Sequence, residues 1–427
     1  TVAWPEVTTP AYLWSRGMLM YRDIKFVHTP GLMGALAAAF SAFGENGDVL
    51  RLFALAGPLA AHGFLLAYTR SLAPGHRIAA SAFFVALFYS FDGNAVWPTV
   101  LMSALSIPIA MQLARARFWT AGVLIGLAIL MKQTAATVLL FAGLRLVTPR
   151  EFRGAARLVI AASLPYIVVM AAFSMAGSGD HMIRWTVEVP WEMRNLMSGG
   201  APRIFPVAML LLAFVPAVAE AWKAPVGRER EEARWLLLVA AGFTAMLYPR
   251  FQMLQAVAAV PCLALSAARF MSRRHGGLLR AATAFVSVFA VSRGAILGAG
   301  GDFDGKVTFW NEEPAFERLI QRLRALPPDA RIYSELWENV LPRAGRLPPG
   351  GVYVHPWLDR FFPGEGLDAR IRDAAVRERA WVVGLRGAGP DAGLGPYRVS
   401  IPLPRAASTR APDRSKSSRS AGSARPP

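Results

Sequence analysis

Charged residues are scarce in this chain. Asp, Glu, Lys and Arg make up 17% of its 427 residues, whereas 54% of them are hydrophobic. Soluble proteins carry about 25% charged residues. The deficit comes from long apolar runs, and the mean hydropathy is accordingly +0.35. Such runs need lipid or a very large core around them, so the composition argues against a string of small soluble domains.

Cysteine and the familiar catalytic signatures are also nearly missing. The single cysteine, Cys262, lies in an apolar run and forms neither an internal disulfide nor a multi-cysteine metal site. The sequence contains no HExxH, no paired CxxC and no GxSxG motif. The sequence therefore indicates no metal ligands and no cofactor, and it leaves a divalent-metal requirement open.

Acidic residues are outnumbered by basic ones, 28 against 46, which gives a net charge of +18. A charge of this size can indicate binding to nucleic acid. Here most basic residues lie in short loops between apolar segments, as in membrane proteins that are oriented by their basic loops. The pattern therefore predicts a lipid bilayer as the partner and no nucleic acid.

The apolar runs predict a polytopic bundle of transmembrane helices. A spanning helix needs about 20 residues to cross the hydrocarbon core. The candidate spans cover residues 49–69, 78–94, 97–114, 118–131, 133–147, 155–175, 204–222, 235–249, 252–268 and 279–298. Residues 31–44 are apolar but shorter, and we expect an interfacial or re-entrant helix there. The two short runs around Lys132 predict either tilted helices or a water-filled cavity where they meet.

Basic residues are distributed unevenly over the two sides that these spans create. If residues 1–48 lie outside, the inner loops hold clusters of Arg and Lys. The outer connections then hold only Lys132, Arg184, Arg194, Arg203 and Arg250. This asymmetry is typical of membrane proteins with cytoplasmic basic loops. It predicts a multi-pass protein of the cell (inner) membrane, with the segment from residue 300 onward on the extracytoplasmic side.

The ends of the chain differ in character from its middle. Residues 300–403 predict a small α/β domain. Asn311 would cap its helix, Phe316, Leu319, Ile320 and Leu323 share one face of that helix, and short strands are expected at 330–333, 352–354 and 380–384. We therefore divide the chain into a first extracytoplasmic loop with interfacial helices (1–48), a transmembrane bundle (49–299), the α/β domain (300–403) and a disordered basic tail (404–427). The chain begins at Thr1 and residues 1–30 contain no spanning segment, so we expect that a first transmembrane helix precedes it.

Two cations near membrane depth are candidates for binding an anion. Lys132 lies between two apolar runs and is followed by the polar Gln133, and Arg250 follows a span directly. Charges at such positions are costly and mark functional sites more often than those in loops. The alternative is that both side chains extend to the headgroups as anchors. Because both map to the outer side, where cations are sparse, we favour a shared anion site.

The outer N-terminal loop adds Glu6, Asp23 and His28. Each of them alone has the features of a solvated surface residue. Together with Lys132 and Arg250 they place carboxylates and cations on one side of the membrane. This set suits transfer from a phosphate-linked donor, in which a carboxylate accepts the proton of the acceptor and the cations stabilise the departing phosphate.

Several segments resemble the GT-C glycosyltransferases, which use polyprenyl-phosphate sugars and include aminoarabinose transferases, protein O-mannosyltransferases and Rgt-type lipopolysaccharide sugar transferases. The stretch PEVTTPAYLWSRGMLMYRDIKFVHTPG resembles their first extracytoplasmic loop, with an acidic residue, a YRD-like turn and a His before Pro. GLAILMKQTA and YPRFQMLQAVAAVP resemble two further family segments. The family usually has an aspartate, often an Asp-Glu pair, at the acidic position, whereas Glu6 stands alone here.

The resemblance implies a GT-C-like fold and an inverting sugar transfer from a polyprenyl-phosphate donor to a hydroxyl of a glycan, lipid or protein. Glu6 would be the general base. Lys132, Arg250 and His28 would hold the lipid phosphate, and Gln133 would also bind substrate. Asp23 and Tyr21 would shape the loop or contact the sugar, and Asp23 is counted with Glu6 as a catalytic residue. A transporter or flippase of a lipid-linked sugar is the main alternative, because it would use the same anion site without a base. A structural subunit of an envelope assembly is the third.

Overall fold

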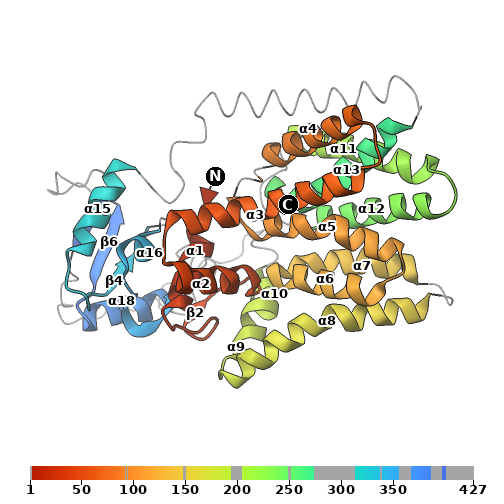
Figure 1. Ribbon diagram of the computed structural model, residues 1–427. Helices are drawn as coiled ribbons and strands as arrows, with labels where there is room; N and C mark the ends of the chain where they lie inside the picture. The colour runs from red at the N-terminus through yellow and green to blue at the C-terminus, as the bar shows by residue number, and fades with distance from the viewer. Residues whose placement is uncertain are drawn as a thin grey trace, which may run out of the picture.

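The structure, a computed structural model, describes residues 2–91, 93, 95–147, 151–193, 204–248, 252–273, 313–336, 339–354, 367–385 and 397–400. It consists of a long helix bundle and a small C-terminal domain, with the first helices of the chain between them (Figure 1). The mainly α-helical fold class predicted from the sequence is confirmed.

The bundle contains α3 (Gly47–Thr69), α4 (Pro74–Ser90), α5 (Pro98–Ala114), α6 (Phe118–Met131), α7 (Ala136–Leu146), α8 (Phe152–Met175), α11 (Ile204–Lys223), α12 (Arg228–Ala245) and α13 (Val260–Ser272). Each predicted span up to 252–268 has a helix at nearly the same place. The last predicted span, 279–298, lies outside the described residues. Proline at the first helical position fixes where α4 and α5 begin, because its missing N–H costs nothing there.

Three helical stretches among the described residues are long and apolar enough to cross a membrane: Gly47–Thr69, Phe152–Met175 and Met253–Ser272. The outer faces of α3 and α8 expose large apolar side chains, for example Leu59 and Val168. Residues 253–272 are instead buried in the centre of the bundle. Apolar surface of this extent is stable only in lipid, and the chain is an integral membrane protein.

Close helix packing depends on small residues. Gly122 and Gly126 of α6 face α8, and a Cβ added to either would lie 2.5 Å from the Leu158 carbonyl oxygen or 2.4 Å from that of Ala162. Small residues four apart allow two helix backbones to approach in this way inside a membrane. The α6–α8 pair is therefore packed backbone to backbone.

Replacing Gly126 with alanine is expected to lower the free energy of unfolding by about 1–3 kcal/mol, since the new methyl group meets a backbone carbonyl that cannot rotate away. The melting temperature of the detergent-solubilised protein measures this. Gly143→Ala in α7 is the matched control, because no atom lies within 4 Å of the added Cβ, and we expect it to be neutral or stabilising by up to about 1 kcal/mol. Equal melting temperatures for the two variants would contradict the packing argument.

The C-terminal domain contains α15 (Pro314–Arg324), α16 (Val340–Ala344) and α18 (Leu367–Arg377) around a sheet of β4 (Ile332–Ser334), β6 (Trp381–Leu385) and β7 (Tyr397–Ser400). β4 and β6 run parallel, and β6 and β7 antiparallel. The predicted apolar face of α15 is fully buried. Glu313, not Asn311, is the residue that precedes α15, and Asn311 lies outside the described residues. The domain boundaries stay a prediction.

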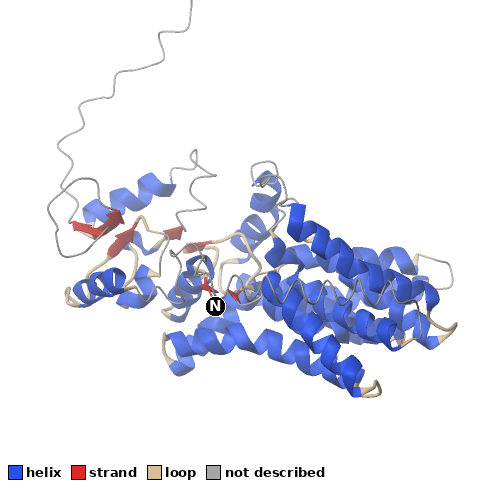
Figure 2. Ribbon diagram, turned by 90° about the horizontal axis from the view of Figure 1, so that it is seen from above, coloured by secondary structure: helices blue, strands red, loops and turns tan. Residues whose placement is uncertain are grey.

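The N-terminal segment joins the two parts. It contains β1 (Val2–Ala3), α1 (Pro5–Ser15), β2 (Ile24–Lys25) and α2 (Gly31–Phe43). α2 has 13 residues and is about 20 Å long, too short to span a bilayer. β1 pairs with β3 (Ala95–Val96) of the bundle, and β2 pairs with β5 (Tyr353–Val354) of the C-terminal domain. Figure 2 shows these short strands where the two parts meet.

Candidate active site

The end of the bundle nearest the C-terminal domain brings several of the predicted residues together. The parallel pairing of β1 with β3 aligns the chain so that Trp4 and Trp97, which follow these strands, meet edge to face with ring centroids 6.2 Å apart. Trp97 is almost completely buried. This aromatic pair connects the N-terminal segment with the helices that carry the candidate cations.

Lys132 occupies a break between two helices. α6 ends at Met131, Lys132 has extended backbone angles, and a 3₁₀ turn (Gln133–Ala135) leads into α7. Its side chain is only 7% exposed. The ammonium nitrogen Nζ donates a hydrogen bond to Gln255 Oε1 at 2.5 Å and lies 5.7 Å from the ring centroid of Trp97. A buried, bonded cation is not a headgroup anchor, which argues against the snorkelling alternative.

The loop before α2 is fixed to the same helix break. Thr29 Oγ1 donates to the carbonyl oxygen of Ile129 at 2.8 Å, and Gln133 Nε2 donates to that of Val27 at 2.6 Å. A Cβ on Gly31 would lie 2.5 Å from the Leu130 carbonyl oxygen, so only glycine allows this approach. Gln133 therefore has a visible role in positioning the loop.

His28 lies in this loop and contacts Trp97 edge to face, with ring centroids 5.8 Å apart. Trp97 thus touches Trp4, His28 and Lys132. Trp97 was not among the residues selected from the sequence. The available signal was a tryptophan directly before Pro98, in a short loop between two predicted spans.

Glu6 lies in the first turn of α1, two residues after Trp4, and is half-buried. A carboxylate is stabilised at a helix N-terminus, because the unpaired N–H groups give that end a partial positive charge. Trp4, the N-cap residue, makes no side-chain capping bond. Glu6 therefore lies in the same helical turn as the residues that follow Trp4, and Trp4 contacts the cluster around Trp97.

The C-terminal domain reaches the same helix. β5 aligns Tyr353 with Ile24, and the Tyr353 amide donates to the Asp23 carbonyl oxygen at 2.8 Å. Burial raises the pKa of the Tyr353 phenol, a hydrogen bond with the Thr9 side chain opposes this, and the charge of Glu6 raises the pKa further. Tyr353 is therefore a neutral phenol near Glu6, and its place could not be found from sequence because no local pattern links it to α1.

Asp23 and Tyr21 shape the loop. Arg22 binds both carboxylate oxygens of Asp23, at 2.9 and 3.0 Å, and the Leu19 amide donates to Oδ2 at 2.8 Å. Partial burial would raise the pKa of Asp23, but these bonds outweigh it and hold the pKa below its usual range. Tyr21 has a positive φ of 69° and its buried hydroxyl donates to the His28 carbonyl oxygen at 2.9 Å. These contacts favour a structural role for both residues.

Arg250 lies outside the described residues, so its predicted proximity to Lys132 stays a prediction. Gln255, five residues later, contacts Lys132 directly. The described residues contain no group of three or more His, Cys, Asp or Glu side chains that would hold a metal ion.

Comparison with known proteins gives a result only at the level of structure. No family model matches the chain, and no curated protein matches it. The fold is similar to that of ArnT from Cupriavidus metallidurans bound to undecaprenyl phosphate, with a TM-score of 0.61 and 13% identity over 90% of this chain and 88% of ArnT. The apo state of ArnT gives a TM-score of 0.58 with 12% identity over 89% and 87%. The chain therefore has an ArnT-like fold.

Proposed function

We propose that this protein is a glycosyltransferase that moves a sugar from a polyprenyl-phosphate donor to an acceptor hydroxyl, with inversion at the anomeric carbon. The main support is the buried ammonium group of Lys132, which lies in a helix break at the same end of the bundle as Glu6. The ArnT-like fold adds to it, because the ArnT of the comparison was bound to undecaprenyl phosphate.

In the proposed reaction the acceptor oxygen attacks the anomeric carbon of the sugar. A new carbon–oxygen bond forms on one face while the bond from that carbon to the phosphate oxygen breaks on the other. Glu6 accepts the proton of the acceptor hydroxyl as general base. The electron pair of the broken bond leaves with the polyprenyl phosphate, whose increased negative charge Lys132 stabilises.

The remaining candidates have supporting roles in this proposal. His28 and Arg250 contact the phosphate together with Lys132, while Gln133 and Tyr21 hold the loop that carries His28. Asp23 keeps the turn closed through Arg22. We propose further that this end of the bundle and the C-terminal domain lie on the extracytoplasmic side of the cell membrane.

The direct test is reconstitution of the full-length protein in vesicles with a polyprenyl-phosphate sugar labelled in the sugar. We expect the label to appear in a glycan, lipid or protein acceptor with release of polyprenyl phosphate, detected by mass spectrometry. Movement of the intact labelled lipid across the vesicle membrane without a new glycosidic bond would identify a transporter or flippase instead. Comparison of envelope glycans from cells with and without the gene identifies the acceptor.

Tyr353→Phe is expected to lower kcat about tenfold and leave donor affinity unchanged, because the lost hydroxyl lies near Glu6 and bonds to Thr9. Steady-state kinetics in which the donor and acceptor concentrations are varied give kcat and the donor KM separately. Tyr333→Phe in β4 of the same domain is the control, since it removes an equivalent hydroxyl away from the β2–β5 contact. A wild-type kcat for Tyr353→Phe would exclude a positioning role for this residue.

A further inference from the structure

The end of the bundle away from the candidate site is rich in arginine, and several of these arginines form ion pairs. Arg273 binds the fully buried Glu220 at 2.8 Å, and Arg269 binds Glu232 at 2.9 Å. These ion pairs connect the ends of α11, α12 and α13. The turn between α11 and α12 lies at this end, far from the C-terminal domain (Figure 1).

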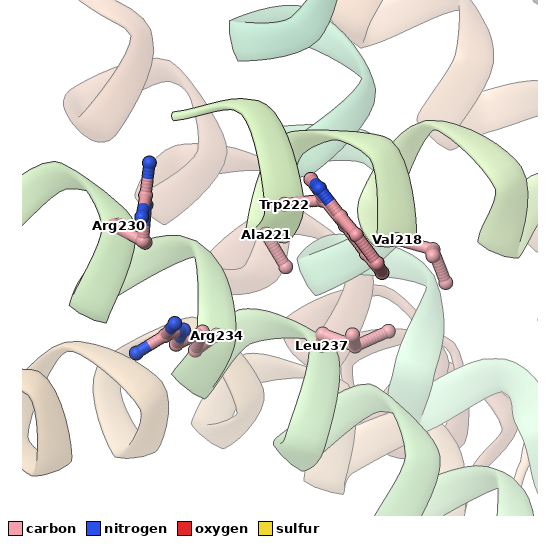
Figure 3. Close-up of a pocket in the computed structure, with 6 residues that line it drawn as sticks. All are labelled: Val218, Ala221, Trp222, Arg230, Arg234 and Leu237. Carbon is pink, nitrogen blue, oxygen red and sulfur yellow. The ribbon is translucent and has the colours of Figure 1, made fainter. Parts of the chain in front are cut away.

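A groove of about 460 Å³ opens beside this network, between α11 and α12. Val218, Ala221 and Trp222 of α11 and Arg230, Arg234 and Leu237 of α12 line it. Figure 3 shows Arg230 and Arg234 on one side of the groove and Val218, Trp222 and Leu237 on the other. The groove therefore has one cationic wall and one apolar, aromatic wall.

At Arg230 the cationic wall carries a positive charge that no carboxylate among the described residues neutralises. Arg230 is half-buried and donates through Nε to the carbonyl oxygen of Ala224 at 2.8 Å; among the described residues it pairs with no carboxylate. Arg234 donates to Glu231 at 3.1 Å, but Arg145 also pairs with Glu231 at 3.3 Å. Arg145 also lies 3.6 Å from Glu151, so these two arginines have two carboxylates between them. Arg230 carries the charge that no carboxylate of the described residues pairs with, and this charge makes the groove complementary to an anion.

The apolar wall continues along the outside of the bundle. Leu211, Val215, Val218 and Trp222 are all exposed and follow one face of α11 at helical spacing. Trp222, at the groove, is 80% exposed. Tryptophan prefers the level of the lipid headgroups. The stripe therefore places the groove where a headgroup ends and an acyl chain begins.

We infer that this groove binds a membrane phospholipid with an anionic headgroup. Its phosphate lies between the guanidinium groups of Arg230 and Arg234, and one acyl chain follows the stripe from Trp222 to Leu211. The charge of the groove selects an anion, and the continuous apolar stripe selects a lipid over a soluble phosphate. The site lies in the leaflet opposite to the candidate active site and does not depend on the proposed sugar transfer.

The test is a titration of the delipidated full-length protein with phosphatidylglycerol or phosphatidylcholine of identical acyl chains, followed by native mass spectrometry. We expect tighter binding of phosphatidylglycerol. The double variant Arg230→Gln/Arg234→Gln is expected to weaken phosphatidylglycerol binding by about tenfold or more and to leave phosphatidylcholine binding unchanged. The single variant Arg230→Gln keeps the Arg234–Glu231 ion pair. We expect it to weaken phosphatidylglycerol binding less than the double variant does. It therefore tests the site if the double variant does not fold.

Arg153→Gln/Arg157→Gln in α8 is the matched control, because it removes two exposed arginines that lie at the same end of the bundle and do not line the groove. We expect it to change phosphatidylglycerol binding less than about twofold. Wild-type selectivity in Arg230→Gln/Arg234→Gln would overturn the proposal. An equal loss in the α8 control would also overturn it, because the attraction would then be a property of the whole charged surface.

Discussion

Glu6→Gln is expected to abolish sugar transfer, with a rate about 10²–10⁴-fold below that of the wild type, because glutamine cannot accept the proton of the acceptor hydroxyl. Glutamine has nearly the same shape as glutamate, and Glu6→Gln leaves Trp97, His28 and Lys132 themselves in place. Donor binding should therefore stay close to the wild-type value. Single-turnover transfer and equilibrium binding of the donor are the two measurements.

The matched control is Glu45→Gln. Glu45 is another carboxylate of the N-terminal segment, and it forms an ion pair with Arg16 at 2.9 Å. Its replacement removes one charge of the same kind near the same end of the bundle, and we expect transfer to continue. If the Glu6→Gln protein transferred sugar at the wild-type rate, Glu6 would not be the general base. Loss of both transfer and donor binding would point instead to a damaged site.

Lys132→Met is expected to weaken binding of the polyprenyl-phosphate donor by about 1.5–3 kcal/mol, or roughly 10- to 100-fold, which is the contribution of a hydrogen bond to a charged group. The transfer rate at saturating donor should fall as well, because the phosphate gains charge as the sugar leaves. Methionine keeps the apolar part of the side chain and removes the ammonium group that lies over Trp97. Donor titration and kcat/KM measurements test both expectations.

Lys223→Met at the end of α11 is the control for the charge alone, since Lys223 is exposed and lies at the opposite end of the bundle. Lys132→Met also leaves the buried amide of Gln255 without its ammonium donor. The melting temperature of Lys132→Met must therefore be compared with that of Gln255→Leu, in which the buried amide is absent, to show how far loss of this hydrogen bond destabilises the protein. Unchanged donor affinity in a stably folded Lys132→Met protein would show that Lys132 does not bind the donor phosphate.

The helices of the bundle could be predicted closely because their signals are local. A run of apolar residues predicts burial in lipid, and proline at the first helical position or asparagine before it sets the start, as with Pro74, Pro98 and Asn46. The same reasoning identified the apolar face of α15. It also identified Lys132 as unusual, because a charge between two apolar runs is costly wherever the chain folds.

The site itself required contacts that no local pattern encodes. Lys132 meets Gln255 across 123 residues, Thr29 meets Ile129 across 100, and β2 pairs with β5 across more than 300 positions of the chain. Gln255 and Tyr353 have no distinctive sequence surroundings, so no local pattern marks either residue. Asp23 was selected for its charge, and only the structure connects that charge to Arg22.

Hydropathy and the distribution of basic residues by themselves determined that this chain is a helical membrane protein and where most of its helices lie, because an apolar run acts within about 20 residues of the chain. Tertiary structure alone decided that Trp97 joins Trp4, His28 and Lys132, and that the C-terminal domain brings Tyr353 to Glu6. Helix packing and strand pairing bring these residues together. The free energy of that packing and pairing depends on surfaces formed by segments that are far apart in the sequence, so no local pattern predicts it.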